Sequence, residues 1–184
     1  MLDQEKTIFE ELNRRLQTED IELSIICVGG FVLSHYGMRT THDIDGFFKT
    51  SRKIEETIKA VGDQFGLNTD NELWLNNSVQ NLNDVPKEEI CETLYQFSNL
   101  RVLIPPLLYI AGMKLTSARE QDIKDVATII HREKIATPDD LKTKMAEFGF
   151  DQIDESVLLE AFGEAYGMEW LEKYYIDNED KISF

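Results

Sequence analysis

Residues 25–48, with the sequence IICVGGFVLSHYGMRTTHDIDGFF, constrain the fold of this chain more than any other stretch. The first four, residues 25–28, are apolar and have the length and composition of a buried strand. Gly29 and Gly30 end that strand, and one or two helical turns follow over residues 31–36. A strand that runs through a glycine pair into a helix leaves backbone N–H groups open to a ligand. The pattern therefore predicts a cradle for phosphate.

Two aspartates, Asp43 and Asp45, follow the short helix with Ile44 between them. Alternation along a strand places both carboxylates on one face and turns Ile44 toward the core. Two like charges that close repel each other unless a cation lies between them. A hard divalent ion, Mg²⁺ or Mn²⁺, takes such oxygens and completes its shell with waters and phosphates. The pair therefore predicts a metal site, and the alternative is a solvated strand edge without a metal.

The glycine pair, the short helix and the Asp-x-Asp strand together resemble the signature of the nucleotidyltransferase superfamily, which has the DNA polymerase β-like fold. Arg39, Thr41 and the Asp43-Ile44-Asp45 sequence are similar to the R-x-[ST]-x-D-[IL]-D version of this signature. That version occurs in AbiEii-type toxins and in related, largely uncharacterised bacterial nucleotidyltransferase-like proteins. The resemblance implies a nucleoside triphosphate bound at the glycine pair and a metal held by the two aspartates. For Arg39, binding phosphate and holding the loop are both open.

A second string, residues 105–125, is similar to the second half of AbiEii-type nucleotidyltransferases. By this resemblance Lys114 reaches the triphosphate and Asp122 supports the site. The alternative is a lysine on an exposed helix face and an aspartate that favours the dipole of the next helix. If Lys114 neutralises triphosphate charge, Lys114→Ala is expected to weaken nucleotide binding by about 1.5–3 kcal/mol and to change the stability of the ligand-free protein very little. The resemblance covers roughly residues 21–130.

Nucleotidyl transfer usually needs a third carboxylate, which acts as a base or completes a two-metal site. The Trp-Leu-Asn-Asn sequence of residues 74–77 resembles a segment of the uncharacterised proteins, in which an acid often stands at the position of Asn77. Trp74 itself is expected to anchor the core. The nearby substitutes for the third acid are Asp70, Glu72 and Asp84. The neutral Asn77 keeps a second interpretation open, a catalytically inactive family member that serves as a binding or regulatory module.

The charge of the chain argues against one class of function. A formal charge of -16 over 184 residues disfavours nonspecific binding to DNA, because phosphate contacts need Lys and Arg. Cys27 and Cys91 offer neither a disulfide framework nor a zinc site, and they suit a reducing compartment. The charged N-terminus lacks the pattern of a signal peptide, and no apolar run has membrane-spanning length. We therefore expect a cytoplasmic protein without a membrane partner.

The periodicity of apolar residues predicts an α+β fold, with a small mixed β-sheet, flanking helices and a helical C-terminal part. Residues 1–132 are predicted to form the nucleotidyltransferase-like domain, and residues 133–184 an acidic helical extension packed on it. Thr137 and Pro138 are predicted to start one helix of that extension. A single longer helix is predicted to run from residues 151–154 toward Tyr175. Further helices are predicted over residues 3–18, 52–65 and 107–119, and a strand hairpin over residues 93–97 and 100–104.

Aromatic side chains recur every three or four residues near the C-terminus, in the order Phe162, Tyr166, Trp170, Tyr174 and Tyr175. Such a stripe is typical of a core or of a surface for a protein partner or a second copy of the chain. The leading hypothesis is a Mg²⁺-dependent nucleotidyltransferase that moves a nucleoside monophosphate from a nucleoside triphosphate to an acceptor. The acceptor could be a protein, an RNA end or a small molecule, and the activity could be that of a toxin in a toxin–antitoxin system.

Overall fold

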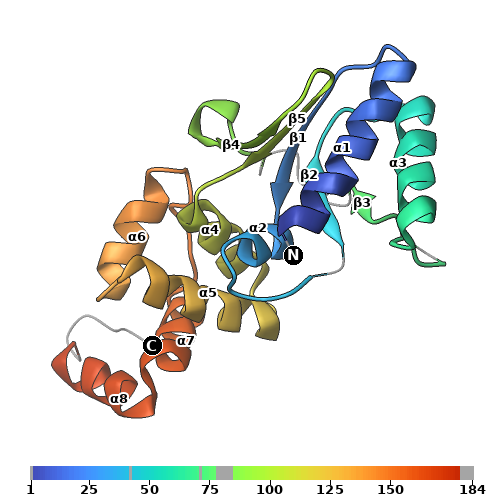
Figure 1. Ribbon diagram of the computed structural model, residues 1–184. Coiled ribbons are helices and arrows are strands. Elements are labelled where there is room, and N and C mark those ends of the chain that lie inside the picture. Colours follow the sequence, from blue (N-terminus) through green and yellow to red (C-terminus); the bar gives the residue numbers. More distant parts are fainter. Residues whose placement is uncertain (1, 42, 71, 78–84, 179–184) are drawn as a thin grey trace. The chain divides into compact units, whose positions relative to one another are not determined.

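The computed structural model describes residues 2–41, 43–70, 72–77 and 85–178, and residues 2–4 by their backbone only. The chain divides into two compact units, Met1–Pro106 and Leu107–Phe184. In the described residues, the first unit contains a five-stranded mixed sheet with flanking helices, and the second contains helices (Figure 1). The predicted α+β fold is confirmed. The domain boundary placed at residue 132 stays a prediction.

The sheet has the strand order β3-β2-β1-β5-β4. Its central strand β1 pairs in parallel with β5 and antiparallel with β2, and the predicted hairpin is the antiparallel pair β4–β5. A central strand is covered on both faces, which explains why the second half of β1 is an unbroken apolar run. The strands are β1 (Leu23–Val28), β2 (Ile44–Phe47), β3 (Leu75–Asn76), β4 (Glu92–Gln96) and β5 (Leu100–Ile104).

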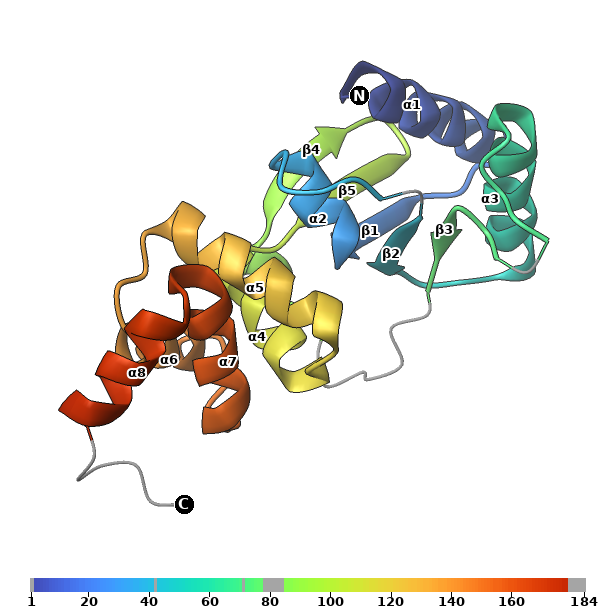
Figure 2. The same ribbon diagram turned by 90° about the horizontal axis from the view of Figure 1, so that it is seen from below.

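Helices α1 (Leu2–Thr18) and α3 (Arg52–Phe65) lie side by side against the sheet (Figure 1 and Figure 2). The short α2 (Gly30–His35) follows β1, and a 3-10 turn, η2 (Glu88–Ile90), precedes β4. Phe9 of α1 is fully buried, and its ring contacts the rings of Phe31, Trp74 and Tyr95. Trp74 is buried as predicted, and its Nε1 donates a hydrogen bond to the Ile58 carbonyl at 2.8 Å. Trp74 is therefore a core anchor of the first unit.

The second unit consists of α4 (Leu107–Ser117), α5 (Glu120–Glu133), α6 (Pro138–Ala146), α7 (Glu155–Tyr166) and α8 (Met168–Asp177). Thr137 caps α6 as predicted, because its side chain accepts a hydrogen bond from the Asp140 N–H at 3.2 Å. The single helix predicted from residues 151–154 to Tyr175 is wrong. Gly167 adopts φ 90° and separates α7 from α8, a conformation that L side chains rarely adopt. None of the described helices combines the length and apolar character needed to cross a membrane.

A tight contact inside the second unit gives a first prediction. Gly112 is buried in α4, and a Cβ added there would lie 2.4 Å from Cδ2 of the Phe150 ring. Gly112→Ala is therefore expected to destabilise the protein by about 1–3 kcal/mol, the usual cost of overpacking. Chemical denaturation measures this loss. Gly163→Ala in α7 is the matched control, because its Cβ would meet the flexible end of Leu171 at 3.1 Å. An equal effect of the two changes would contradict the prediction.

Candidate functional site

The glycine pair and Asp45 meet at the end of the central strand. Val28, the last residue of β1, is paired with Asp45 in the antiparallel register of β1 and β2. Gly29 follows with φ 63° and ψ -136°, and a Cβ added there would lie 3.3 Å from Asp45 Oδ2. One carboxylate oxygen of Asp45 thus lies directly against the backbone of the turn. The structure therefore brings the glycine turn and Asp45 into contact, and their roles in phosphate and metal binding stay predictions.

The loop that carries Arg39 and Thr41 packs on the second glycine. A Cβ added to Gly30 would lie 3.1 Å from Thr41 Oγ1 and 3.6 Å from Arg39 Cζ. Thr41 Oγ1 also donates a hydrogen bond to Asp43 Oδ1 at 2.8 Å. Thr41 therefore links the glycine turn to Asp43. This contact was not predicted from the sequence, although Thr41 belongs to the motif.

Asp43 lies outside the strand in which it was predicted. Strand β2 begins at Ile44, and Asp43 occupies a bend before it with an exposed side chain, whereas Asp45 is half-buried. The reason lies in the partner strand. Because β1 ends at Val28, opposite Asp45, and the chain then turns at Gly29, β1 extends no further toward Asp43.

The neutral residue beside Asp45 is Asn76 rather than Asn77. The parallel pairing of β2 and β3 aligns Asp45 with Asn76, so both side chains project from the same face of the sheet. Asn77 instead donates a hydrogen bond from Nδ2 to the Phe48 carbonyl at 3.0 Å. Asn76 was missed because a two-residue strand has no periodicity from which to read its face.

Among the described residues, carboxylates beyond the aspartate pair do not complete a metal-binding group. Asp70 and Glu72 are exposed and lie outside the strands, while Asp84 falls outside the described residues. Within the part of the chain that the structure describes, no cluster of three or more His, Cys, Asp or Glu side chains could hold a metal. Mg²⁺ commonly binds proteins through only one or two carboxylates, with waters and phosphates in its remaining positions. Asp43 and Asp45, with the amide of Asn76, fit that requirement.

Cys27 lies close enough to Asp45 to be influenced by its charge. Burial raises the pKa of the Cys27 thiol far above its usual range, and the charges of Asp45 and Glu5 raise it further. Cys27 therefore stays a neutral thiol and is a core residue rather than a metal ligand. His35 also fits a packing role, since its ring contacts that of Tyr36 edge-on.

Lys114 and Asp122 belong to a charged cluster within the second unit. The Lys114 ammonium lies 2.7 Å from Asp122 Oδ1 and 2.6 Å from Asp125 Oδ2, joining α4 to α5. The Lys114 side chain is only 9% exposed, so it does not occupy the exposed helix face considered as an alternative. The expected small effect of Lys114→Ala on stability assumed an exposed side chain, and the burial of Lys114 removes that assumption. A role of Lys114 and Asp122 in nucleotide binding stays a prediction.

The aromatic stripe near the C-terminus is divided between core and surface. Phe162 is fully buried, and Trp170 stacks on it with ring centroids 5.3 Å apart. Trp170 also stacks on Tyr174 at 5.2 Å. On α8, Met168 and Ile176 are 65% and 75% exposed, which leaves apolar side chains in contact with solvent.

One family match covers the sheet and nearly all of the helices, from residue 4 in α1 to the end of α8. The model of the family described as Nucleotidyltransferase of unknown function (DUF6036) matches residues 4–177. The match includes the C-terminal helices, so the limit of residues 21–130 inferred for the resemblance was too narrow. Comparisons with curated proteins and with solved structures gave no significant match. With both the glycine–aspartate corner and the helical part inside the matched range, the chain belongs to the nucleotidyltransferases of unknown function (DUF6036).

Proposed function

We propose that the chain is a Mg²⁺-dependent nucleotidyltransferase that moves a nucleoside monophosphate from a nucleoside triphosphate to an acceptor. The observation that carries this proposal is the contact of Asp45 Oδ2 with the Gly29 turn, where a Cβ would lie only 3.3 Å away. Asp45 would thus help to hold a divalent metal ion beside a turn whose backbone N–H groups would bind phosphate. This arrangement suits transfer at phosphorus.

In this proposal Gly29 and Gly30 bind phosphate through their backbone N–H groups, and Arg39, beside Gly30, adds a guanidinium. Asp43 and Asp45 would hold Mg²⁺ or Mn²⁺, and the ion would supply the positive charge that neutralises the phosphates during transfer. The contribution of the chain is mostly positioning: Thr41 fixes the Asp43 carboxylate, and the pairing of β1 and β2 fixes Asp45.

Lys114 and Asp122 enter the proposal through the AbiEii resemblance. The Lys114 ammonium already has two carboxylate partners. To bind a phosphate it would have to exchange at least one of them. The acceptor, whether a protein, an RNA end or a small molecule, and the role as a toxin rest on the same resemblance.

A second candidate function is that of a catalytically inactive module that binds a protein partner or a second copy of the chain. Two observations favour it. The residue aligned with Asp45 on β3 is the neutral Asn76. The exposed Met168 and Ile176 on α8 offer apolar contacts for a partner.

Titration calorimetry with the four common nucleoside triphosphates separates the two candidates. We expect binding heat in the presence of millimolar Mg²⁺ or Mn²⁺ and none with EDTA, because neither the turn nor the carboxylates hold a triphosphate alone. Absence of heat with all four nucleotides and metal would reject the enzyme and leave the binding module.

The hydrogen bond between Thr41 and Asp43 gives a further prediction. Thr41→Val keeps the shape of the side chain but removes the donor to Asp43 Oδ1. The Asp43 carboxylate then loses one of the contacts that orient it. We expect binding of Mg²⁺ and nucleoside triphosphate to weaken by about 1 kcal/mol, roughly fivefold. Calorimetry measures the change.

Thr50→Val is the matched control for this variant. Thr50 Oγ1 donates to the Glu55 carboxylate at the same distance, 2.8 Å, but at the start of α3. Loss of that bond is expected to leave nucleotide binding unchanged. Equal binding constants for the Thr41 and Thr50 variants would show that Thr41 does not position a metal ligand.

A further inference from the structure

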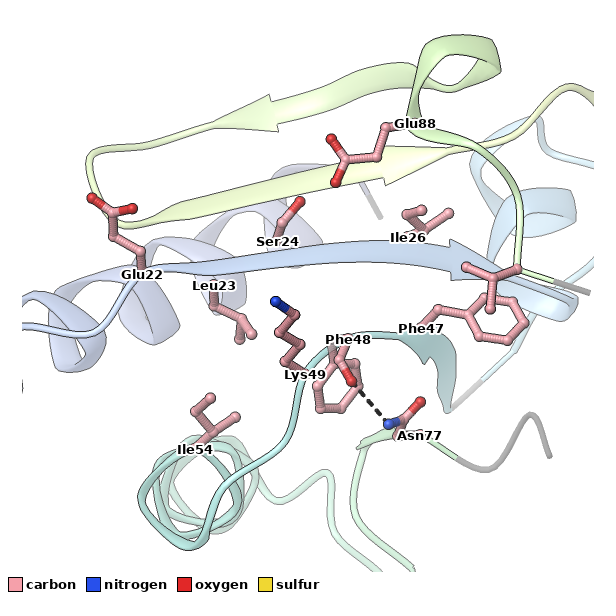
Figure 3. A pocket seen from close by; sticks show the side chains of 11 residues that line it. Glu22, Leu23, Ser24, Ile26, Phe47, Phe48, Lys49, Ile54, Asn77 and Glu88 are labelled. Atoms are coloured by element: carbon pink, nitrogen blue, oxygen red, sulfur yellow. Dashed lines mark hydrogen bonds between the residues drawn. The ribbon is translucent and has the colours of Figure 1, made fainter. Parts of the chain in front are cut away.

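A cavity of about 610 Å³ opens on the first unit, between β1, the end of β2, the start of α3 and η2 (Figure 3). Its volume lies within the range typical of small-molecule sites, about 300–1,000 Å³. Ile26 and Phe47, each less than a tenth exposed, form a fixed apolar floor. None of the roles proposed above uses this cavity.

The cavity opens on the face of the sheet that carries Asp45. Val28 pairs with Asp45, and two residues along the same strands Ile26 pairs with Phe47, so all four side chains project from one face. Two residues correspond to about 7 Å along a strand. The floor of the cavity therefore lies two residues along the strands from Asp45. Because β1 and β2 are neighbours in the sheet, no described strand lies between the floor and Asp45.

Polar side chains also line the cavity, among them Ser24, Lys49 and Glu88. Arg101 Nε donates to Ser24 Oγ at 3.4 Å, and the Arg101 guanidinium forms an ion pair with Glu88. Figure 3 shows Lys49 extending into the cavity from the end of β2, opposite Ser24. A ligand here would meet an apolar floor, a hydroxyl, a carboxylate and an ammonium group. That combination suits a flat, partly apolar body that carries hydroxyl and ring-nitrogen groups.

We propose that this cavity binds the ribose and base of the nucleotide whose phosphates lie at Gly29 and Asp45; the inference rests on the function proposed above. The sugar is covalently attached to the α-phosphate, so the nucleoside must occupy space within a few ångströms of the metal-binding carboxylates. On the face that carries Asp45, the cavity provides that space. Phe47 and Ile26 contact the base, and Ser24, Glu88 and Lys49 meet the polar edges of the base and sugar.

Two variants that reduce the cavity test this assignment. Ser24→Leu places a branched side chain into it from β1, and Val85→Trp narrows it from an exposed position on its rim. Thr93→Leu, on an exposed position of β4 that does not line the cavity, is the matched control. Each protein is titrated, in Mg²⁺, with the four nucleoside triphosphates and with inorganic tripolyphosphate, which has the phosphates but no nucleoside.

The expected result is that wild type binds its preferred nucleoside triphosphate at least tenfold more tightly than tripolyphosphate. At least one cavity variant should lose tenfold or more in affinity for the nucleotide and stay within twofold for tripolyphosphate. Thr93→Leu should match wild type for both ligands. Unchanged nucleotide affinity in both cavity variants would overturn the inference and leave the cavity to another ligand, such as the acceptor. Equal losses for both ligands would also overturn it.

Failure of this inference and failure of the proposed function give different results. If the wild-type protein binds tripolyphosphate and nucleotide equally well in the presence of metal, the phosphate and metal site is supported and the nucleoside cavity is rejected. A wild type that binds neither ligand rejects both.

Discussion

Lys114→Met is expected to lower the free energy of unfolding by about 3–5 kcal/mol, the cost of removing one partner from a buried ion pair. The Lys114, Asp122 and Asp125 side chains are 9%, 13% and 5% exposed. Without the Lys114 ammonium, the Asp122 and Asp125 carboxylates stay close together where little water reaches them. Urea denaturation at neutral pH measures the loss. The urea concentration at the unfolding midpoint should fall, while the dependence of the unfolding free energy on urea should stay the same.

Lys124→Met is the matched control, because Lys124 forms a 2.6 Å ion pair with Glu120 on α5 but is 49% exposed. Its loss is expected to change the free energy of unfolding far less than Lys114→Met does, because water and salt screen an exposed ion pair. Adding Asp122→Asn and Asp125→Asn to Lys114→Met should restore part of the lost stability. If Lys114→Met instead leaves stability unchanged and weakens binding of Mg²⁺ and nucleotide, Lys114 belongs to the phosphate site as the resemblance implies.

Elements with strong local signals could be predicted from the sequence. The apolar run before Gly29 predicted strand β1, and the helix predicted over residues 52–65 is α3, which ends at Phe65 before the left-handed Gly66. The glycine pair and Asp45 were expected to serve one site because the nucleotidyltransferase resemblance includes both. Their contact in the structure comes from the pairing of β1 with β2, in which Val28 lies opposite Asp45.

Contacts that depend on pairing between distant segments could not be predicted. Whether Asn76 or Asn77 lies beside Asp45 depends on the register of a two-residue strand. The burial of Lys114 depends on how α4 packs against α5, where Asp122 and Asp125 meet the ammonium group. The separation of α7 from α8 depends on which of two glycines, Gly163 or Gly167, adopts a positive φ. Sequence periodicity alone carries none of this information.

Asp45→Asn is expected to abolish the stabilisation that Mg²⁺ and nucleoside triphosphate confer on the protein. At a hundredfold excess of ligand over its dissociation constant, that stabilisation is about 2.7 kcal/mol. The amide keeps the size of the side chain at Asp45 but removes the charge that a hard cation requires. In the absence of ligand, the variant should gain up to about 1 kcal/mol, because repulsion with the Asp43 carboxylate is relieved.

Thermal unfolding of wild type, Asp45→Asn and the control Asp20→Asn, each with and without Mg²⁺ and nucleoside triphosphate, tests the central claim most directly. Asp20 is an exposed residue of the first unit whose φ of 54° an asparagine also tolerates. The proposed site predicts that the ligands raise the midpoint of wild type and Asp20→Asn and leave that of Asp45→Asn unchanged. An Asp45→Asn protein that is destabilised without ligand and keeps the full ligand-induced shift would contradict a metal site at Asp45.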